Sequence, residues 1–317
     1  MEGISHRTLP VNGINMHIAE KGEGPVVILI HGFPELWYSW RHQILSLAAR
    51  GYHAVAPDLR GYGDSEAPPS TASYSILHIV GDIVALIDAV SEDQVFVVGH
   101  DWGAIVAWWL CVLRPDKVKA LVNLSVPYNP RNPKLKTVDG IRAIFGEDHY
   151  ICRFQEQGAI EAEFEQIGTA TLFKKVLTYR TPAAWIIPKE IGFANSIEAP
   201  AGLPSWLTEE DIDYFASKFE KSGFTGGLNY YRCMNLSWEL TAPWTGVQVK
   251  VPTKFIIGDL DLTYHTPGAQ DYIHKGVFKK LVPLLEDVVV MEGVGHFINQ
   301  EKPHEISDLI YDFIQKF

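Results

Sequence analysis

A carboxylate stands where the chain is arranged to expose a reactive side chain. Residues 95–103 read VFVVGHDWG, an apolar run followed by a turn of small residues around an acid and then by a helical pattern. This order is typical of a nucleophile elbow, whose small flanking residues permit a strained turn above a sheet. The exposed residue is Asp101, and no G-x-S-x-G motif offers a serine instead. An ionised carboxylate can displace a leaving group at an sp3 carbon and form an ester that water must cleave.

A base and an orienting acid are predicted near the C-terminus. His296 follows a β-branched run and a glycine-flanked loop in VVVMEGVGHFINQEKP, where it can reach the elbow if both lie at the same sheet edge. The acid is expected in the loop after the preceding strand, FIIGDLDLTYH, which offers Asp259 and Asp261. Spacing alone does not choose between these two aspartates.

The segment HGFPE, residues 31–35, ends the first long apolar run. A glycine beside an expected cis-proline turn places backbone N–H groups, and we predict an oxyanion hole from the N–H groups of Phe33 and Trp102. His31 is expected to be a structural histidine that holds this loop. Glu35 is predicted to help position a water molecule, and the Trp102 side chain to line the site.

Six short apolar runs can supply the strands that place these residues. Helical patterns separate most of them, so the sequence predicts an α/β fold with a mostly parallel sheet flanked by helices. The predicted strands are residues 26–30, 53–57, 94–98, 119–124, 253–257 and 287–291.

The alternation of strands and helices stops near residue 129 and resumes near residue 247. The intervening segment has helical spacing and many aromatics, and Thr208 is predicted to cap a helix with an acidic first turn. We therefore expect a core of residues 1–129 and 246–317 and an inserted all-helical cap, or lid, of residues 130–245. A cap over the carboxyl ends of the strands would cover the place where open α/β sheets bind ligands. Its apolar residues predict a substrate tunnel that includes Trp185, Ile186, Ile187, Phe193 and Leu203.

Composition excludes several classes of partner. The chain has 27 Lys and Arg against 38 Asp and Glu, a net charge of −11, so nucleic acid and anionic membranes are not expected partners. Cys111, Cys152 and Cys233 have no zinc-ligand or disulfide-scaffold spacing, which predicts free thiols in a reducing compartment. With no apolar run long enough to span a membrane and no targeting signal, we expect a cytoplasmic protein, monomeric or homodimeric. The turn at residues 58–65 lacks phosphate-loop spacing, and we expect neither a metal nor a cofactor.

Five segments together resemble the soluble epoxide hydrolases of the α/β-hydrolase superfamily, most closely the plant cytosolic members. The resemblance runs nearly end to end and implies an α/β-hydrolase fold with a cap. It also implies cofactor-independent conversion of an epoxide and water into a vicinal diol. The segments are HGFPE from His31, RGYGDS from Arg60, GHDWG from Gly99, GDLDLTYH from Gly258 and GHFINQEKP from Gly295.

The resemblance also implies the roles of five residues: Asp101 as nucleophile, His296 as base, Asp261 as orienting acid, and the cap tyrosines Tyr150 and Tyr231 as donors to the epoxide oxygen. The chemistry agrees, because ring opening releases an alkoxide and a phenol with a reference pKa of about 10 can protonate it. Tyr230 competes with Tyr231, but neighbouring helical residues point about 100° apart, so one of them is expected to face Asp101.

Two other functions fit parts of the pattern. A haloalkane dehalogenase shares the fold, the aspartate nucleophile and the following tryptophan, but it needs N–H donors for a halide rather than phenols for an oxygen. A hydrolase-fold receptor binds a hormone and often has a degraded triad, whereas this triad is complete. For an epoxide hydrolase, the apolar cap fits epoxy fatty acids as well as aryl or alkyl epoxides.

Overall fold

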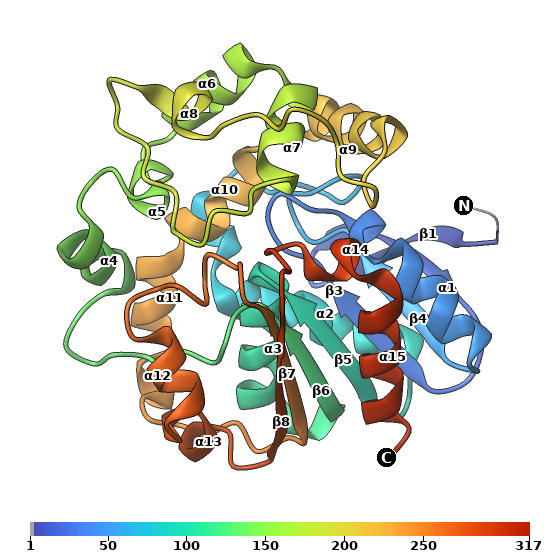
Figure 1. The fold of residues 1–317 in the computed structure, drawn as a ribbon. Helices are drawn as coiled ribbons and strands as arrows, with labels where there is room; N and C mark the ends of the chain where they lie inside the picture. The colour runs from blue at the N-terminus through green and yellow to red at the C-terminus, as the bar shows by residue number, and fades with distance from the viewer. Residues whose placement is uncertain (1–2) are drawn as a thin grey trace.

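The computed structural model describes residues 3–317 and contains an eight-stranded sheet of order β1-β2-β4-β3-β5-β6-β7-β8 (Figure 1). The strands are β1 (Ser5–Val11), β2 (Ile14–Lys21), β3 (Val26–Ile30), β4 (His53–Pro57), β5 (Val95–His100), β6 (Val118–Leu124), β7 (Thr253–Gly258) and β8 (Leu285–Met291). β1 and β2 run antiparallel to their neighbours, and the six other strands are parallel. The α/β class expected from the sequence is confirmed.

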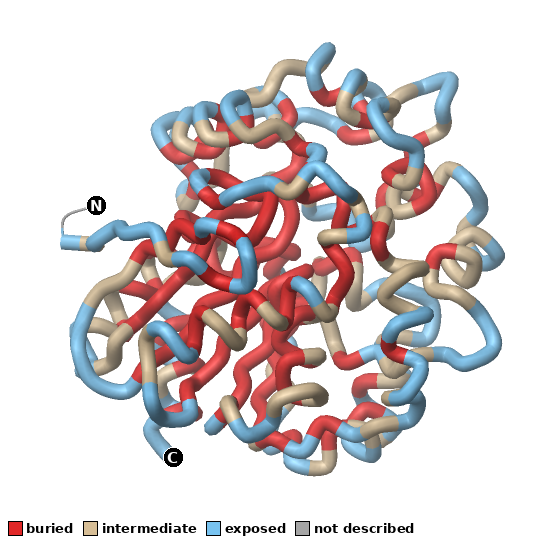
Figure 2. The backbone as a smooth tube through the Cα atoms, turned by 180° about the vertical axis from the view of Figure 1, so that it is seen from behind, coloured by how far each residue is buried: buried red, intermediate tan, exposed pale blue. Residues whose placement is uncertain are grey.

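Helices cover both faces of the sheet. On one face α1 (Arg41–Ala49) packs against α15 (Pro303–Ile314), and on the other α2 (Ile76–Val90) packs against α3 (Trp102–Leu113) (Figure 1). All residues of β3 and β5 are buried as a result, and Figure 2 shows this buried centre inside an exposed periphery. The remaining core helices are α12 (Ala269–His274), α13 (Val277–Leu281), α14 (Ile298–Glu301) and the 3-10 turns η1 (Trp37–Trp40), η2 (Thr71–Tyr74) and η3 (Pro115–Lys117).

Between β6 and β7 the chain is helical and lies across the carboxyl ends of the strands (Figure 1). One isolated bridge joins His149 and Ile186 there. The boundaries at residues 129/130 and 245/246 fall in the connections on either side and stay a prediction. The helices are α4 (Thr137–Phe145), α5 (Tyr150–Arg153), α6 (Ala159–Ile167), α7 (Thr169–Leu177), α8 (Gly192–Ser196), α9 (Glu209–Ser222), α10 (Thr225–Arg232), α11 (Met234–Leu240) and η4 (Ala242–Trp244).

Local signals account for several helix ends. The predicted cap at Thr208 is confirmed: its hydroxyl accepts from the N–H of Asp211 at 3.1 Å, and the Asp211 carboxylate accepts from the N–H of Thr208 at 2.9 Å. Gly168, with φ of 81°, separates α6 from α7 because this left-handed conformation suits glycine and ends the first helix.

The antiparallel strands β1 and β2 were not among the predicted strands. β1 is an edge strand with mostly exposed residues, and β2 mixes polar with apolar positions, so neither has the continuous apolar run of a strand buried on both faces. Among the helices of residues 3–317, none is long and apolar enough to cross a membrane.

Candidate active site

Asp101 sits in a strained turn between β5 and α3. Its φ of 52° and ψ of −119° are rare for a residue with a side chain. Glycine is required on both sides, because a Cβ on Gly99 would lie 2.5 Å from the carbonyl oxygen of Gly103, and one on Gly103 would lie 2.0 Å from that of Ile30. A Cβ on Gly32 would lie 2.4 Å from the Asp101 Cβ. The backbone therefore closes tightly around Asp101 and leaves its carboxylate facing a cavity.

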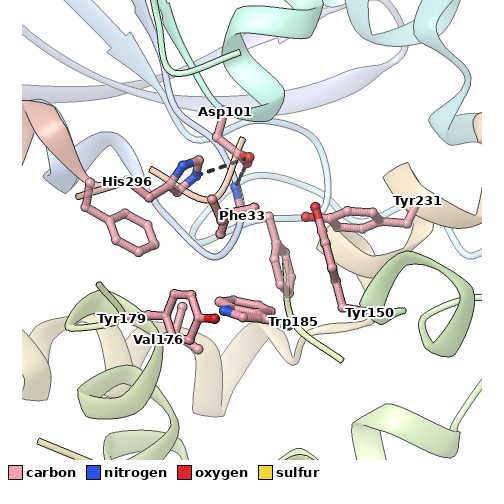
Figure 3. Close-up of a pocket in the computed structure, with 10 residues that line it drawn as sticks. Phe33, Asp101, Tyr150, Val176, Tyr179, Trp185, Tyr231 and His296 are labelled. Atoms are coloured by element: carbon pink, nitrogen blue, oxygen red, sulfur yellow. Dashed lines mark hydrogen bonds and ion pairs between the residues drawn. The ribbon is translucent and has the colours of Figure 1, made fainter. Parts of the chain in front are cut away.

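His296 and Asp261 come to this carboxylate from the loops that follow β8 and β7, and Figure 3 shows His296 beside Asp101. The Nε2 atom of His296 lies 3.4 Å from Oδ2 of Asp101. Its Nδ1 atom donates to Asp261, with both carboxylate oxygens at 3.0 Å. Asp261 is fully buried and also accepts from the N–H and the hydroxyl of Thr263, each at 2.8 Å. The three side chains thus form the continuous arrangement expected of a nucleophile, a base and an orienting acid.

The two carboxylates control the charge of His296. Burial alone would lower the pKa of the imidazole, but Asp261 and Asp101 outweigh this effect and hold it well above its ordinary value. Burial likewise favours a raised pKa for Asp261, and the adjacent His296 reverses this and lowers it. The two carboxylates therefore favour the protonated form of the imidazole by more than burial disfavours it.

Asp259, which spacing left as an alternative acid, has a different position. Its Oδ1 atom accepts from the N–H groups of Gly293 at 2.7 Å and Val294 at 3.2 Å. Asp259 thus fixes the turn that leads to His296, while the contact with the imidazole belongs to Asp261.

The HGFPE segment places one N–H group directly on the carboxylate of Asp101. Phe33 N–H donates to Oδ1 of Asp101 at 2.8 Å, and the Phe33–Pro34 bond is cis. Trp102 is the first residue of α3, so its N–H has no acceptor within the helix. His31 is fully buried: its Nδ1 donates to the Gly32 carbonyl at 2.8 Å and its Nε2 accepts from Leu59 N–H at 3.0 Å. These bonds agree with a structural histidine.

Glu35 lies behind the cavity rather than on its wall. It is fully buried, and Nδ1 of His100 donates to its Oε2 at 2.7 Å, while Nε2 of His100 donates to the His296 carbonyl at 2.7 Å. Burial alone would raise the pKa of Glu35, but His100 lowers it to about 2. Gln300 connects Glu35 to the helices between β6 and β7. Its amide nitrogen donates to Glu35 at 3.2 Å, and its amide oxygen accepts from Arg41. Arg41 in turn pairs with Asp211 of α9 at 3.1 Å.

Tyr150 and Tyr231 reach the cavity from α5 and α10. Their ring centroids lie 6.0 Å apart, and Figure 3 shows both hydroxyls meeting on the side of the cavity that Asp101 faces. Burial, followed by the negative charge of Asp101, raises the pKa of both phenols above the ordinary value, so both are protonated at neutral pH. Tyr230 points elsewhere, with its hydroxyl donating to the Arg60 carbonyl at 3.0 Å.

The cavity wall combines predicted and unpredicted residues. Leu262 and Phe297 immediately follow Asp261 and His296, so their position beside the cavity could have been inferred from the sequence. Val176 and Tyr179 come from the end of α7 and the residues after it, and no pattern in the sequence indicates that they line the cavity. Of the five predicted tunnel residues, Trp185 lines the cavity and the other four do not. Ile186 is 46% exposed, Leu203 is partly buried, and Ile187 and Phe193 are buried among the helices between β6 and β7. The wall is formed by Phe33, Asp101, Tyr150, Val176, Tyr179, Trp185, Tyr231, Leu262, His296 and Phe297.

Within residues 3–317, His17, Asp58 and Asp64 form a group with ligand types suited to a metal ion. These side chains already have protein partners. Nδ1 of His17 donates to Asp58 at 2.8 Å, and Asp64 pairs with Lys218. None of the three lines the cavity. We assign no metal to this group.

Comparison with known proteins identifies the family. A family model described as alpha/beta hydrolase fold matches residues 25–145. Epoxide hydrolase 2 of Siraitia grosvenorii is 63% identical over 317 residues and is matched over 100% of both chains. The chain belongs to the epoxide hydrolase family.

More distant and structural relatives agree with this membership. Epoxide hydrolase A of Mycobacterium tuberculosis is 38% identical over 99% of this chain and 98% of its own. The structure of potato (Solanum tuberosum) epoxide hydrolase I superposes with a TM-score of 0.96 at 63% identity, over 99% of this chain and 100% of that chain. The turn at Asp101, the loop that carries His296, and Tyr150 and Tyr231 therefore belong to a member of the epoxide hydrolase family.

Proposed function

We propose that the enzyme converts an epoxide and water into a vicinal diol through a covalent ester on Asp101. One observation carries this proposal: two protonated phenols, Tyr150 and Tyr231, meet across the cavity from the carboxylate of Asp101, which is backed by His296. An epoxide needs a nucleophile on carbon and an acid on oxygen, and this cavity offers both on opposite sides.

In the first step a carboxylate oxygen of Asp101 attacks an epoxide carbon. Oδ1 is held by Phe33 N–H at 2.8 Å, which leaves Oδ2 as the attacking atom. A new C–O bond forms as the epoxide C–O bond breaks, and the released oxygen takes the bond's electron pair. Tyr150 and Tyr231 donate hydrogen bonds to this oxygen, and one of them transfers its proton.

In the second step water attacks the carbonyl carbon of the ester. His296 takes the proton of the water, and the resulting oxyanion accepts from the N–H groups of Phe33 and Trp102. Collapse of this intermediate breaks the C–O bond to the substrate, and His296 returns its proton to the departing alkoxide, which completes the diol. The acid proton left on Asp101 passes to the phenolate formed in the first step, so the Asp101 carboxylate and both phenols are restored. Esterification removes the negative charge of Asp101, which is one cause of the raised pKa of His296, so the first step prepares the imidazole to act as a base.

We assign Glu35 a positioning role in the second step. Its carboxylate holds His100, and His100 donates to the His296 carbonyl at 2.7 Å. Glu35 therefore acts on the water through the backbone that carries the base. The Trp102 side chain, which was predicted to line the site, is not part of the cavity wall; its ring packs against the Tyr231 ring at 5.2 Å and holds that phenol in place.

We further propose that residues 130–245 form a cap domain that encloses the substrate. Its aromatic wall fits the apolar part of an epoxide, such as an aryl or alkyl epoxide or the chain of an epoxy fatty acid. The cysteines Cys111, Cys152 and Cys233 are free and buried, which supports a cytoplasmic location. A monomer or a homodimer stays our prediction for the assembly.

Parallel measurement of diol and halide tests the function. The purified enzyme is incubated with a panel of epoxides and chloroalkanes of matched size, and both products are measured. We expect diol from epoxides and no chloride above background, because phenols suit an oxygen leaving group. Chloride without diol would instead identify a dehalogenase, and tight binding without either product would identify a receptor.

Single-turnover labelling tests the covalent ester. With enzyme in excess over epoxide in 18-oxygen water, the first diol formed should be mostly unlabelled, because its new oxygen comes from Asp101. Label should then appear in the Asp101 carboxylate, which mass spectrometry of the peptide can detect. Fully labelled diol in the first turnover would mean that water attacks the epoxide directly.

A further inference from the structure

The cavity wall contains a hydrogen-bond donor that the mechanism does not use. Within residues 3–317, seven buried polar side-chain atoms lack a hydrogen-bond partner, and Nε1 of Trp185 is the one in this set that belongs to a cavity-lining residue. Trp185 is 8% exposed. A buried donor without an acceptor costs free energy, and an indole N–H usually finds a partner when buried. Such an unpaired group beside a substrate site points to an acceptor supplied by the substrate.

The surroundings of Trp185 show where an acceptor would enter. Its indole packs at right angles to the rings of Tyr179 and Phe193, each at 5.7 Å, and lies 5.4 Å from the ring of Tyr150. Figure 3 draws the indole nitrogen on the side of Tyr179. Tyr179 is only partly buried, and its hydroxyl donates to the Ala183 carbonyl at 2.9 Å, within the connection between α7 and α8. The Tyr179 ring is thus the part of the wall that must shift to uncover the N–H.

The chemistry of the wall selects a neutral acceptor. The lining residues include no lysine or arginine, and a single neutral N–H cannot compensate for the burial of a carboxylate. Transfer of a neutral ether or carbonyl oxygen out of water costs far less free energy than transfer of a carboxylate, and one hydrogen-bond donor is enough to compensate for it. Because Figure 3 places Trp185 on the opposite wall of the cavity from Asp101, this oxygen belongs to the substituent of the epoxide rather than to its reacting ring.

We propose that Nε1–H of Trp185 donates to a neutral acceptor oxygen on the substituent of the substrate, and that the enzyme therefore favours epoxides whose side chain carries an ether or carbonyl oxygen. This inference rests on the proposed epoxide hydrolysis and narrows its substrate class. Trp185 is a specificity residue in this proposal, and the reaction steps at Asp101 do not depend on it.

The test uses a series of terminal epoxides of equal length. One member has an all-carbon chain, and the others carry an ether oxygen at successive positions. kcat/KM is measured for the wild type, for Trp185→Phe, which keeps an aromatic ring but removes the N–H, and for Trp206→Phe. Trp206 is the matched control, because its Nε1 is also buried without a partner but it does not line the cavity.

At one ether position we expect the wild type to favour the ether over the all-carbon parent by about 3- to 10-fold, as one neutral hydrogen bond provides. Trp185→Phe should abolish this preference mainly through KM, while Trp206→Phe should keep it. Turnover of the all-carbon parent reports whether each variant is folded. A series without a favoured position, or a preference that survives in Trp185→Phe, overturns the inference, whereas the absence of diol from every member overturns the proposed function itself.

Discussion

Replacing His296 with asparagine should leave an enzyme that forms the ester but does not release it. Asparagine cannot take a proton from water, so ester hydrolysis should slow by about 100- to 10,000-fold, the contribution of a positioned general base. Alkylation should continue, because attack by Asp101 needs an ionised carboxylate and the two phenols rather than a base. Intact-mass spectrometry after mixing with an epoxide should therefore show the enzyme plus one substrate.

The matched control for this variant is His304→Asn, an exposed position on α15 outside the cavity. It should turn over like the wild type and accumulate no adduct. If His296→Asn binds substrate without forming an adduct, then His296 acts in the first step and its role here is wrong. If it forms diol at the normal rate, another group activates the water.

Changing both Tyr150 and Tyr231 to phenylalanine should nearly abolish alkylation. Each single change removes one donor to the same oxygen while the other phenol still shares the developing charge, so each should slow alkylation by roughly 10- to 1000-fold. Loss of both leaves the alkoxide without an acid and should cost more than about 10,000-fold. The two substitutions should not act as independent sites, because the two hydroxyls serve one atom.

Pre-steady-state quenching of tryptophan fluorescence can follow this step, since Trp102 lies beside Asp101. Tyr230→Phe is the matched control, because the hydroxyl of this neighbouring tyrosine does not reach the cavity. The substitution removes a hydrogen bond to the Arg60 carbonyl and so affects folding stability rather than the reaction. Its alkylation rate should be close to that of the wild type. A double variant that still alkylates at a near wild-type rate would remove the tyrosines from the mechanism and favour the dehalogenase alternative.

Much of the fold was predictable because buried parallel strands carry a strong local signal. The runs at residues 26–30 and 53–57 coincide with β3 and β4, since a strand covered on both faces must be apolar at nearly every position. β1 escaped prediction because its exposed edge position removes that requirement. The helical content between β6 and β7 was equally readable, and Thr208 marked its own helix by capping chemistry.

The candidate site shows where local signals end. The elbow around Asp101 could be predicted because its strained turn requires small residues within a few positions. Residues 99 and 103 must be glycine, since a Cβ at either position would lie less than 3 Å from backbone atoms. The distinction between Asp259 and Asp261 depended on which carboxylate the β8 loop meets. In the structure Asp259 binds the backbone of that loop and Asp261 binds the imidazole of His296. The two aspartates are only two residues apart, so the sequence alone could not assign these contacts.

By itself the sequence determined which residue types are available, and it predicted a chemistry from them: a carboxylate nucleophile, a histidine after a neighbouring strand and tyrosines in a helical insert. Only the tertiary structure decided which atoms meet, such as the two hydroxyls of Tyr150 and Tyr231, the placement of Glu35 behind His296 and the unpaired N–H of Trp185. The physical reason is that backbone strain and apolar burial are local and leave a pattern in neighbouring residues. The contacts of a cavity instead join side chains from β3, β5, β7, β8 and the helices above them, and packing across those elements sets their distances.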